Sequence, residues 1–152
     1  MEEVTLRPIT LSDTDLIVKW RNSDAVRLNM YDQKILTAER HRDYFHKQIE
    51  TGLAPQYIIE YKNNAVGTIF YKRLHENKVE IGLFIGDESL YGRGIGKKAL
   101  NRLIDYIRCS GCKRIVLKVN RNNTRASNLY LHTGFEITDN TALFVEMALN
   151  LM

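Results

Sequence analysis

Residues 90–100 read LYGRGIGKKAL, and this glycine-rich stretch is the most informative segment of the sequence. It follows a β-rich run and opens a segment with the apolar periodicity of a helix. Glycine lets consecutive backbone N–H groups turn toward one point, because no Cβ stands in the way. The first N–H groups of a helix have no partner inside the helix, and the helix dipole adds positive potential there. Arg93, Lys97 and Lys98 add charge at the same end. The stretch therefore predicts a turn that can hold a diphosphate.

Two other phosphate-binding loops fit this stretch less well. The Walker pattern needs a serine or threonine after its Gly-Lys pair, but Lys98 follows Gly96-Lys97. The dinucleotide pattern Gly-x-Gly-x-x-Gly needs its last glycine one place after Gly96. A tight strand-to-helix turn that binds no ligand stays open as an alternative.

The segments before the glycine-rich stretch predict a short strand, two helices and a meander. A strand is expected over residues 4–9, and Ser12 or Asp13 can cap the helix that follows it. A second helix is expected from Thr37 to a stop at Gly52. Three β-rich runs separated by short polar turns then indicate an antiparallel meander, over residues 56–62, 65–74 and 79–85.

Helices and strands alternate in the second half. We expect helices over residues 94–108 and 124–132, a strand over 114–119, and short strands near Phe135 and over 143–149. The pattern predicts an α/β (α+β) fold with a central mixed, mostly antiparallel sheet and helices on both faces. The 152 residues suit a single domain that spans residues 1–152.

Composition narrows the classes of function. The chain carries 22 Lys+Arg against 18 Asp+Glu, an excess that suits either a solvated basic surface or attraction of an anionic partner. No arginine-rich run or aromatic RNA-binding motif favours nucleic acid. No apolar window or signal pattern favours a membrane, so the cytoplasm is the default. No residue spacing predicts a metal site. Cys109 and Cys112 are expected to be incidental, reduced thiols, with a redox pair as the alternative.

A second motif lies downstream, where residues 122–135 read NNTRASNLYLHTGF. Together with the glycine-rich stretch it resembles the GNAT superfamily of acetyltransferases. That family carries Gln/Arg-x-x-Gly-x-Gly/Ala and later Asn-x-x-Ala-x-x-Leu-Tyr-x-x-x-Gly-Phe. The positions that match in register are Gly94, Gly96, Asn123, Ala126, Leu129, Tyr130, Gly134 and Phe135. Tyr91 stands where the family often has Gln or Arg, which puts one side-chain phosphate contact in doubt.

The resemblance implies an N-acetyltransferase that moves acetyl from acetyl-coenzyme A (acetyl-CoA) directly to a primary amine, on a splayed central sheet. The pantetheine arm would pair with the backbone of Leu83, Phe84 and Ile85 as an added strand. The diphosphate would lie on the N–H groups of Arg93, Gly94, Ile95, Gly96 and Lys97. Asn123 would contact the cofactor or cap its helix, and the two roles are compatible.

Two residues are candidates for the chemistry. Tyr130 matches the family's general acid, and a phenol with a pKa of ~10 is protonated at neutral pH. A buried aromatic that only packs is the alternative. Glu80 interrupts an apolar strand and is the candidate base, because alternation places it on one face with Gly82 and Phe84. The alternatives for Glu80 are an outward, solvated acid beside Lys78, or a base that acts through water.

The acceptor amine is expected to bind near the N-terminal helices. The segments WRN and NMY, which contain Arg21, Asn22, Met30 and Tyr31, resemble the start of the ribosomal-protein and nucleotide-amino-sugar (pseudaminic acid pathway) branch of the family. Arg21 and Asn22 would help bind a sugar nucleotide, while Met30 and Tyr31 would line an apolar or stacking surface. The alternative is a helix end with no ligand.

Other acceptors and another class of function stay open. Protein N-termini and polyamines share the same broad layout, but a polyamine site should be acidic. The region instead carries Arg21 and Arg27 against Asp24 and Asp32. A catalytically silent acyl-CoA-binding module is the alternative from a different class. Family members are often dimers, so a homodimer is considered.

Overall fold

A seven-stranded sheet forms the centre of the molecule, in the order β1-β2-β3-β4-β5-β7-β6. The computed structural model describes residues 3–30 and 32–151. Every neighbouring pair is antiparallel except β4 and β5, which are parallel. The strands are β1 (Val4–Pro8), β2 (Gln56–Tyr61), β3 (Asn64–Arg73), β4 (Lys78–Ile85), β5 (Arg114–Asn120), β6 (Glu136–Asn140) and β7 (Phe144–Asn150).

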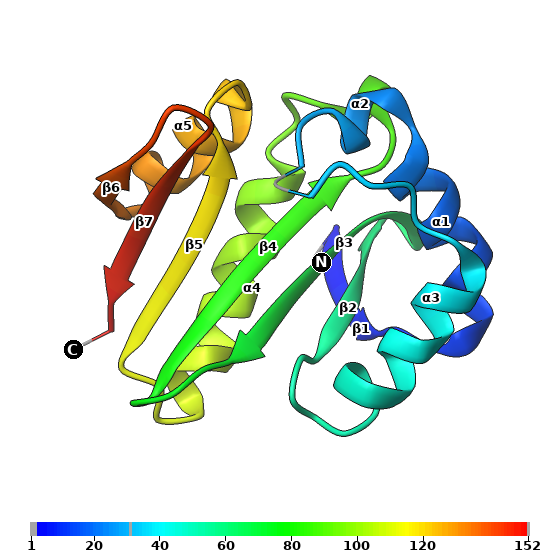
Figure 1. Ribbon diagram of the computed structural model, residues 1–152, viewed down its shortest axis with the longest axis horizontal. Helices are drawn as coiled ribbons and strands as arrows, with labels where there is room; N and C mark the ends of the chain where they lie inside the picture. Colours follow the sequence, from blue (N-terminus) through cyan, green and yellow to red (C-terminus); the bar gives the residue numbers. More distant parts are fainter. Residues whose placement is uncertain (1–2, 31, 152) are drawn as a thin grey trace.

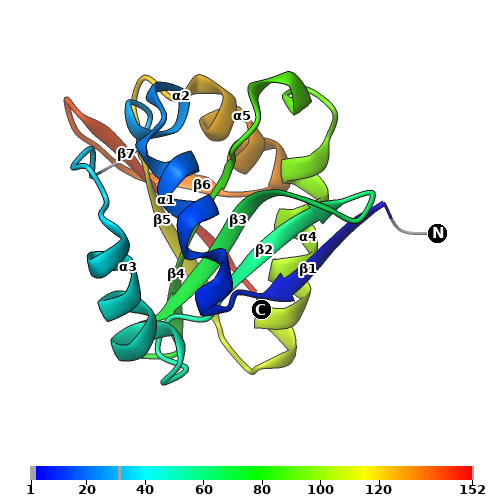
Figure 2. The same cartoon turned by 90° about the vertical axis from the view of Figure 1, so that its right-hand side faces the viewer.

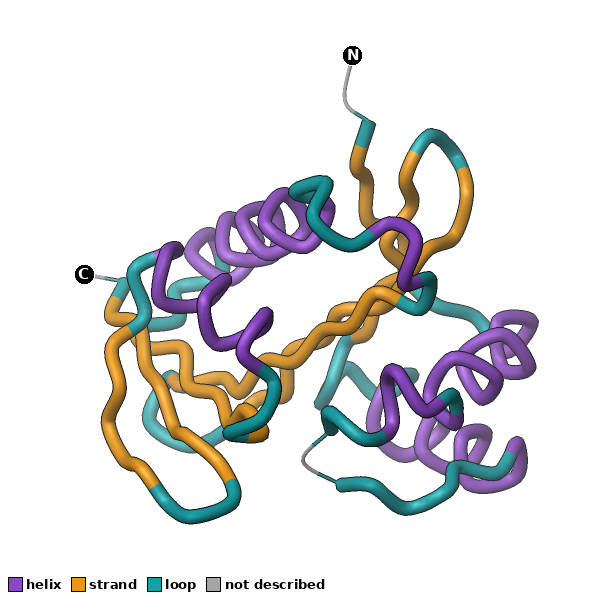
Figure 3. Tube along the Cα trace, turned by 90° about the horizontal axis from the view of Figure 1, so that it is seen from above, coloured by secondary structure: helices purple, strands orange, loops and turns teal. Residues whose placement is uncertain are grey.

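Helices cover both faces of this sheet, as the sequence predicts. One group lies on one side of the strands and a second group on the other (Figures 1, 2 and 3). The first group comprises α1 (Thr14–Asn22), α2 (Asp24–Arg27) and α3 (Ala38–Tyr44), which continues as a π-helical turn, η2 (Phe45–Ile49). The second group comprises α4 (Ile95–Cys109) and α5 (Thr124–Thr133). Short 3-10 turns precede α1 and α4, namely η1 (Leu11–Asp13) and η3 (Glu88–Leu90).

The core is divided between the two faces by strand alternation. On β2, Ile59 joins the larger buried cluster with Leu100 and Leu103 of α4, whereas its neighbour Ile58 joins a smaller cluster with Ile17 and Trp20 of α1. Successive side chains of a strand point to opposite faces, so β2 holds both helical layers.

The sheet is splayed between β4 and β5. These strands pair only where Lys78–Glu80 lies beside Arg114–Val116, although β4 continues to Ile85 and β5 to Asn120. Figure 1 shows the two strands diverging from their shared end. The expected mixed, splayed sheet is therefore confirmed, and within the described residues one edge of β4 has no strand partner beyond Glu80.

The start of α1 differs from the expectation that Ser12 or Asp13 caps it. Asp13 occupies the capping position, but its side chain makes no capping bond to the helix. Its carboxylate instead accepts the N–H of Thr10 at 2.8 Å and two bonds from Arg7 at 2.9 Å. These bonds hold the pKa of Asp13 below its usual range, and hydrogen bonding by Arg7 is the largest cause.

Both meander turns contain two left-handed residues. Lys62 and Asn63 have φ of +50° and +68°, and Glu76 and Asn77 have φ of +62° and +58°. Such turns match the twist of antiparallel strands, which explains the tight hairpins.

None of the helices in the described residues has the length and apolar character of a membrane span.

Candidate functional site

The glycine-rich turn connects the end of β4 to α4. Gly92 and Gly94 have φ of +79° and +78°, a conformation that favours glycine. A Cβ built on either residue would meet nothing within 4 Å, so open space lies beside both. Gly94 is the N-cap of α4, whose first turn contains no acidic residue. The first amides of α4 therefore lie beside open space without intrahelical partners, at the turn where the sequence predicts a diphosphate site.

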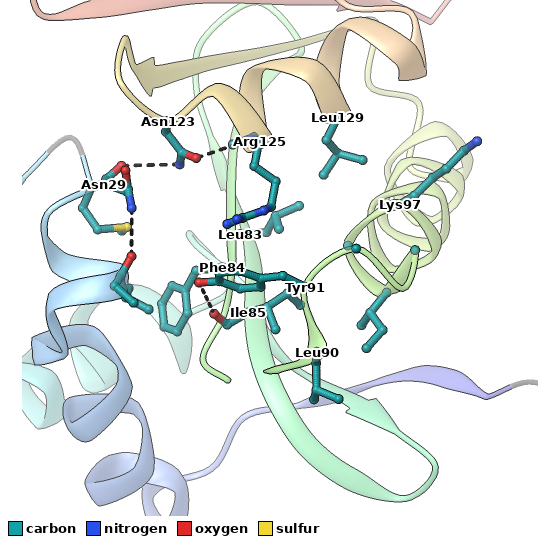
Figure 4. Close-up of a pocket in the computed structure, with 18 residues that line it drawn as sticks. Asn29, Leu83, Phe84, Ile85, Leu90, Tyr91, Lys97, Asn123, Arg125 and Leu129 are labelled. Carbon is teal, nitrogen blue, oxygen red and sulfur yellow. Dashed lines mark hydrogen bonds between the residues drawn. The ribbon is translucent and has the colours of Figure 1, made fainter. Parts of the chain in front are cut away.

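A cavity of about 220 Å³, here named the cofactor channel, opens at this turn (Figure 4). Its walls come from α2 and the segment after it, the end of β4, the glycine-rich turn and the start of α5. The lining residues are Ala25, Val26, Asn29, Met30, Leu83, Phe84, Ile85, Leu90, Tyr91, Gly92, Gly94, Ile95, Gly96, Lys97, Asn123, Arg125, Ala126 and Leu129. All the residues expected to hold the cofactor are among them except Arg93, which is exposed.

The channel fits coenzyme A (CoA) by geometry and charge. Gly94, Ile95 and Gly96 present the N-terminal end of α4 to the space. Lys97 and Arg125 supply positive charge from two different helices. Along the opposite wall, the unpaired edge of β4 offers backbone N–H and C=O groups to an extended chain.

A second cavity of about 450 Å³, here named the acceptor chamber, lies on the other side of the same strand end. Its lining residues are Ile17, Arg21, Asn29, Met30, Asp32, Leu36, His41, Tyr44, Gln56, Thr68, Phe70, Lys72, Glu80, Ile81, Gly82, Leu83, Phe84, Lys118, Val119, Asn120, Asn123, Ala126 and Tyr130. It shares six of these with the cofactor channel: Asn29, Met30, Leu83, Phe84, Asn123 and Ala126. The two cavities thus meet at the point where β4 leaves β5.

Tyr130 lies in the wall of the acceptor chamber. Its side chain is 4% exposed and packs edge-on against Phe135, with ring centroids 5.7 Å apart. Burial raises the pKa of its phenol well above the usual value, so the hydroxyl is protonated at neutral pH. Tyr130 therefore packs in the core and lines the chamber with a phenol that is protonated at neutral pH.

Glu80 also lines the acceptor chamber, together with Gly82 and Phe84 of the same strand. In the strand register it stands opposite Lys72 of β3. Its charge contributes, after burial, to the raised pKa of the Tyr44 hydroxyl, which lines the same space. Glu80 is thus placed on the chamber face of β4, where a base for an incoming amine would be needed.

Asn123 caps α5 and lines both cavities. Its side-chain oxygen accepts the N–H of Ala126 at 3.3 Å, and its Nδ2 donates to the carbonyl of Asn29 at 3.5 Å. Nearby, Asn120 donates to the carbonyl of Met30, also at 3.5 Å. These contacts tie the N-terminal helical layer to β5 and α5 across the splayed strands.

The residues expected at the acceptor divide into two kinds. Arg21 and Met30 line the chamber. One nitrogen of Arg21, Nη1, is buried without a hydrogen-bond partner among the described residues, while Nη2 donates to the carbonyl of Asp32. Asn22 lines neither cavity, because both polar atoms of its side chain bond the backbone of Leu36 at 2.7 Å. Tyr31 lies outside the described residues.

Sequence reasoning missed several chamber residues. Thr68, Phe70 and Lys72 lie on one face of β3, and the alternation of that strand could have grouped them. His41 of α3 is 3% exposed, and burial lowers its pKa. No local pattern indicated that α3 would contribute His41 and Tyr44 to the chamber wall. Among the described residues, no three His, Cys, Asp or Glu side chains are grouped to hold a metal.

The glycine-rich turn at one cavity and the second cavity that meets it are the arrangement that an acyltransferase needs for its two substrates. The family model described as an acetyltransferase (GNAT) domain matches residues 3–136. The chain therefore belongs to the GNAT acetyltransferase family, and that prediction is confirmed.

Two curated relatives illustrate the breadth of the family. An uncharacterized protein of Methanocaldococcus jannaschii is 26% identical over 140 residues, which cover 90% of this chain and 28% of the relative. The spermine/spermidine N(1)-acetyltransferase of Bacillus subtilis is 35% identical over 86 residues, which cover 56% of this chain and 48% of the relative. The chain spans less than half the length of either.

Solved structures agree on the fold. A domain from Methanocaldococcus jannaschii has a TM-score of 0.87 at 25% identity, with 97% of both chains covered. The spermidine N-acetyltransferase of Vibrio cholerae, solved with CoA and spermine, has a TM-score of 0.88 at 17% identity, with 98% of this chain and 96% of the other covered. A putative acetyltransferase of Salmonella typhimurium, solved with acetyl-CoA, has a TM-score of 0.81 at 20% identity, with 99% and 95% covered. None of these matches assigns the chain to the expected amino-sugar branch.

Proposed function

We propose that this chain is an acetyl-CoA-dependent N-acetyltransferase that transfers acetyl directly to a primary amine. The observation that carries the proposal is the meeting of two cavities at Leu83 and Phe84. One cavity has the diphosphate cradle at Gly94, and the other has the candidate acid Tyr130 and the candidate base Glu80. This arrangement holds a thioester and an amine on either side of one strand edge.

The residues of the chamber divide the proton transfers between them. Bound acetyl-CoA supplies an activated acetyl thioester. Glu80 accepts a proton from the acceptor's ammonium group, directly or through water, so that the neutral amine can attack. Backbone N–H groups on the unpaired edge of β4 donate to the carbonyl oxygen at which negative charge develops. Tyr130, which burial keeps protonated at neutral pH, donates its phenol proton to the departing CoA thiolate, so that CoA leaves as the free thiol.

The charges of the acceptor chamber favour an acceptor that carries an anionic group. Three basic side chains, Arg21, Lys72 and Lys118, line it against two acidic ones, Asp32 and Glu80. Within the part of the chain that the structure describes, Arg21 also keeps one buried nitrogen without a partner, which costs stability unless a ligand bonds it. A nucleotide-linked amino sugar has both the amine and the phosphates that such a chamber suits.

A polyamine is the second candidate acceptor, because relatives with spermine or spermidine in their names match this chain. The charge balance of the chamber opposes it, since like charges in a confined site repel. A silent acyl-CoA-binding module would need neither Tyr130 nor Glu80 in the chamber. We therefore place acetyl transfer to an anionic acceptor first.

Thiol release from acetyl-CoA tests this proposal over a panel of amines. The panel contains a nucleotide-linked amino sugar, spermidine, spermine, an aminoglycoside and a peptide with a free N-terminus. The nucleotide-linked sugar should give the highest kcat/KM. Arg21→Gln should lower that kcat/KM about tenfold, the effect of one charge-assisted hydrogen bond, and Arg21→Lys less. Arg40→Gln, which removes an exposed charge outside both cavities, is the control.

Each other outcome points to a different function. If spermidine or spermine gives the highest kcat/KM, the acceptor is a polyamine and the proposal of an anionic acceptor is wrong. Tight CoA binding with no turnover on any amine would favour the silent module. Sedimentation of the purified chain with and without CoA tests the homodimer, which stays a prediction.

A further inference from the structure

Arg125 and Tyr91 form a stacked pair in the cofactor channel (Figure 4). The guanidinium carbon of Arg125 lies 3.8 Å from the centroid of the Tyr91 ring. The Tyr91 hydroxyl donates to the carbonyl of Ile85 at 3.4 Å. The pair thus joins the start of α5, the turn before α4 and the end of β4 at the place where the channel passes the end of the sheet.

The placement of Arg125 is unfavourable for the fold alone. The residue is exposed and lies in the first turn of α5, where the helix dipole disfavours a cation. Its stack on Tyr91 is worth about 0.5–1 kcal/mol at an exposed site. Within the described residues its guanidinium makes no hydrogen bond or ion pair, so solvent or a ligand satisfies its donors.

An anion in the channel would satisfy those donors. The amides of Ile95 and Gly96 line the same cavity from α4, and Lys97 adds charge beside them. Arg125 reaches in from α5, on the facing wall, and its planar fork suits phosphate oxygens. Through Tyr91, Arg125 is linked to the carbonyl of Ile85 at the end of β4.

We infer that Arg125 binds the diphosphate of CoA from the wall opposite the glycine-rich turn, and that Tyr91 is a positioning residue that holds its guanidinium. The inference rests on the proposed function only in that CoA binds in this channel. Arg125 thereby brings positive charge to the diphosphate from α5, a different helix from the one that begins at the glycine-rich turn.

Calorimetric titration tests the role of Arg125. Arg125→Gln should raise the Kd for CoA about tenfold, the size expected for one charge-assisted contact. Dephospho-CoA retains the diphosphate and lacks only the 3′-phosphate, so its Kd should rise by the same factor. Turnover with S-acetylpantetheine, which has no diphosphate, should be unchanged. Arg108→Gln, which removes an exposed charge near the far end of α4, is the matched control.

A double-mutant cycle tests the role of Tyr91. Tyr91→Leu should raise the Kd for CoA about threefold in the wild-type background and leave it unchanged in Arg125→Gln, because Tyr91 acts through Arg125. Tyr91→Phe keeps the ring and should retain wild-type affinity. Thermal melts without ligand show that each variant is folded.

Several results would overturn the inference. The first is an Arg125→Gln variant that binds CoA with the same Kd as the Arg108→Gln control. The second is a loss of affinity in Arg125→Gln that is seen with CoA but not with dephospho-CoA. The third is a threefold rise in the Kd for CoA when Tyr91→Leu is added to Arg125→Gln. Failure of the wild-type chain to bind CoA would instead reject the proposed function itself. The two failures are therefore distinguishable.

Discussion

Substitution of Gly94 by aspartate tests the diphosphate cradle most directly, because a matched glycine lies near the other end of the same helix. Gly94 precedes α4 with φ of +78°, and Gly111 follows it with φ of +84°. A Cβ added to either would meet no atom within 4 Å. The left-handed backbone therefore imposes a similar cost on both variants, about 1–2 kcal/mol.

The two variants differ in what the new carboxylate faces. At Gly94 it enters the cofactor channel, where it can accept the first amides of α4 and so occupy the cradle itself. It also repels the diphosphate: two unit charges about 6 Å apart interact by about 3 kcal/mol at an effective dielectric constant of about 20. Screening by solvent in the open channel lowers this to about 2 kcal/mol, or about a 30-fold increase in the Kd for CoA.

Titration with CoA and thermal melts of the free protein separate binding from folding. Gly111→Asp should lose at least as much stability as Gly94→Asp, since the dipole disfavours an acid after a helix, and yet it should bind CoA normally. Gly94→Ala introduces the backbone strain without the charge, so its Kd for CoA should lie between those of Gly111→Asp and Gly94→Asp. Unchanged affinity in Gly94→Asp, or an equal loss in Gly111→Asp, would refute the cradle.

Three further perturbations probe the rest of the site. Tyr130→Phe should lower kcat by about 100-fold or more and leave the Kd for CoA unchanged, because general-acid catalysis contributes about that much; wild-type turnover would remove its acid role. In Gly67→Ala the new Cβ would lie 2.2 Å from the backbone oxygen of Phe84, so urea unfolding should show a loss of about 1–3 kcal/mol and turnover should fall with it. Burial lowers the pKa of His41 below its usual 6.5, so the unfolded chain takes up a proton that the folded chain refuses, and the free energy of unfolding should fall as the pH drops below about 6.5. His41→Leu should flatten that decline in the free energy of unfolding between pH 7.5 and 5.5. An unchanged slope would show that another group controls the decline. Asp13 affects stability only at lower pH, because its pKa is depressed.

The cofactor side of the site was predictable because its parts are contiguous. Residues 90–97 carry the turn and the start of the helix within one stretch, so glycine conformation and the helix end could be read locally. The three meander strands were predictable for the same reason, since each turn joins neighbours in sequence. The stack of Arg125 on Tyr91 was not, because it depends on how α5 docks beside the turn.

The acceptor side was less predictable, since periodicity shows which face of an element is apolar but not which elements meet. Arg21 was expected at the acceptor and lines the chamber, but its orphaned nitrogen results from long-range packing. Asn22 looked like a ligand residue by its neighbourhood, and instead its amide joins α1 to Leu36. Asp13 looked like a cap, and Arg7 draws its carboxylate toward β1.

The same contrast explains why similarity to other family members informs the two cavities unequally. The cradle needs backbone amides and glycines, so substitutions elsewhere leave it intact, and a fold shared at 17–25% identity can retain it. The acceptor chamber depends on single side chains from α1, β3, β4 and β5, each of which can change without disturbing the sheet. The charges of Arg21 and Lys72, rather than the names of relatives, should therefore decide between a polyamine and an anionic acceptor.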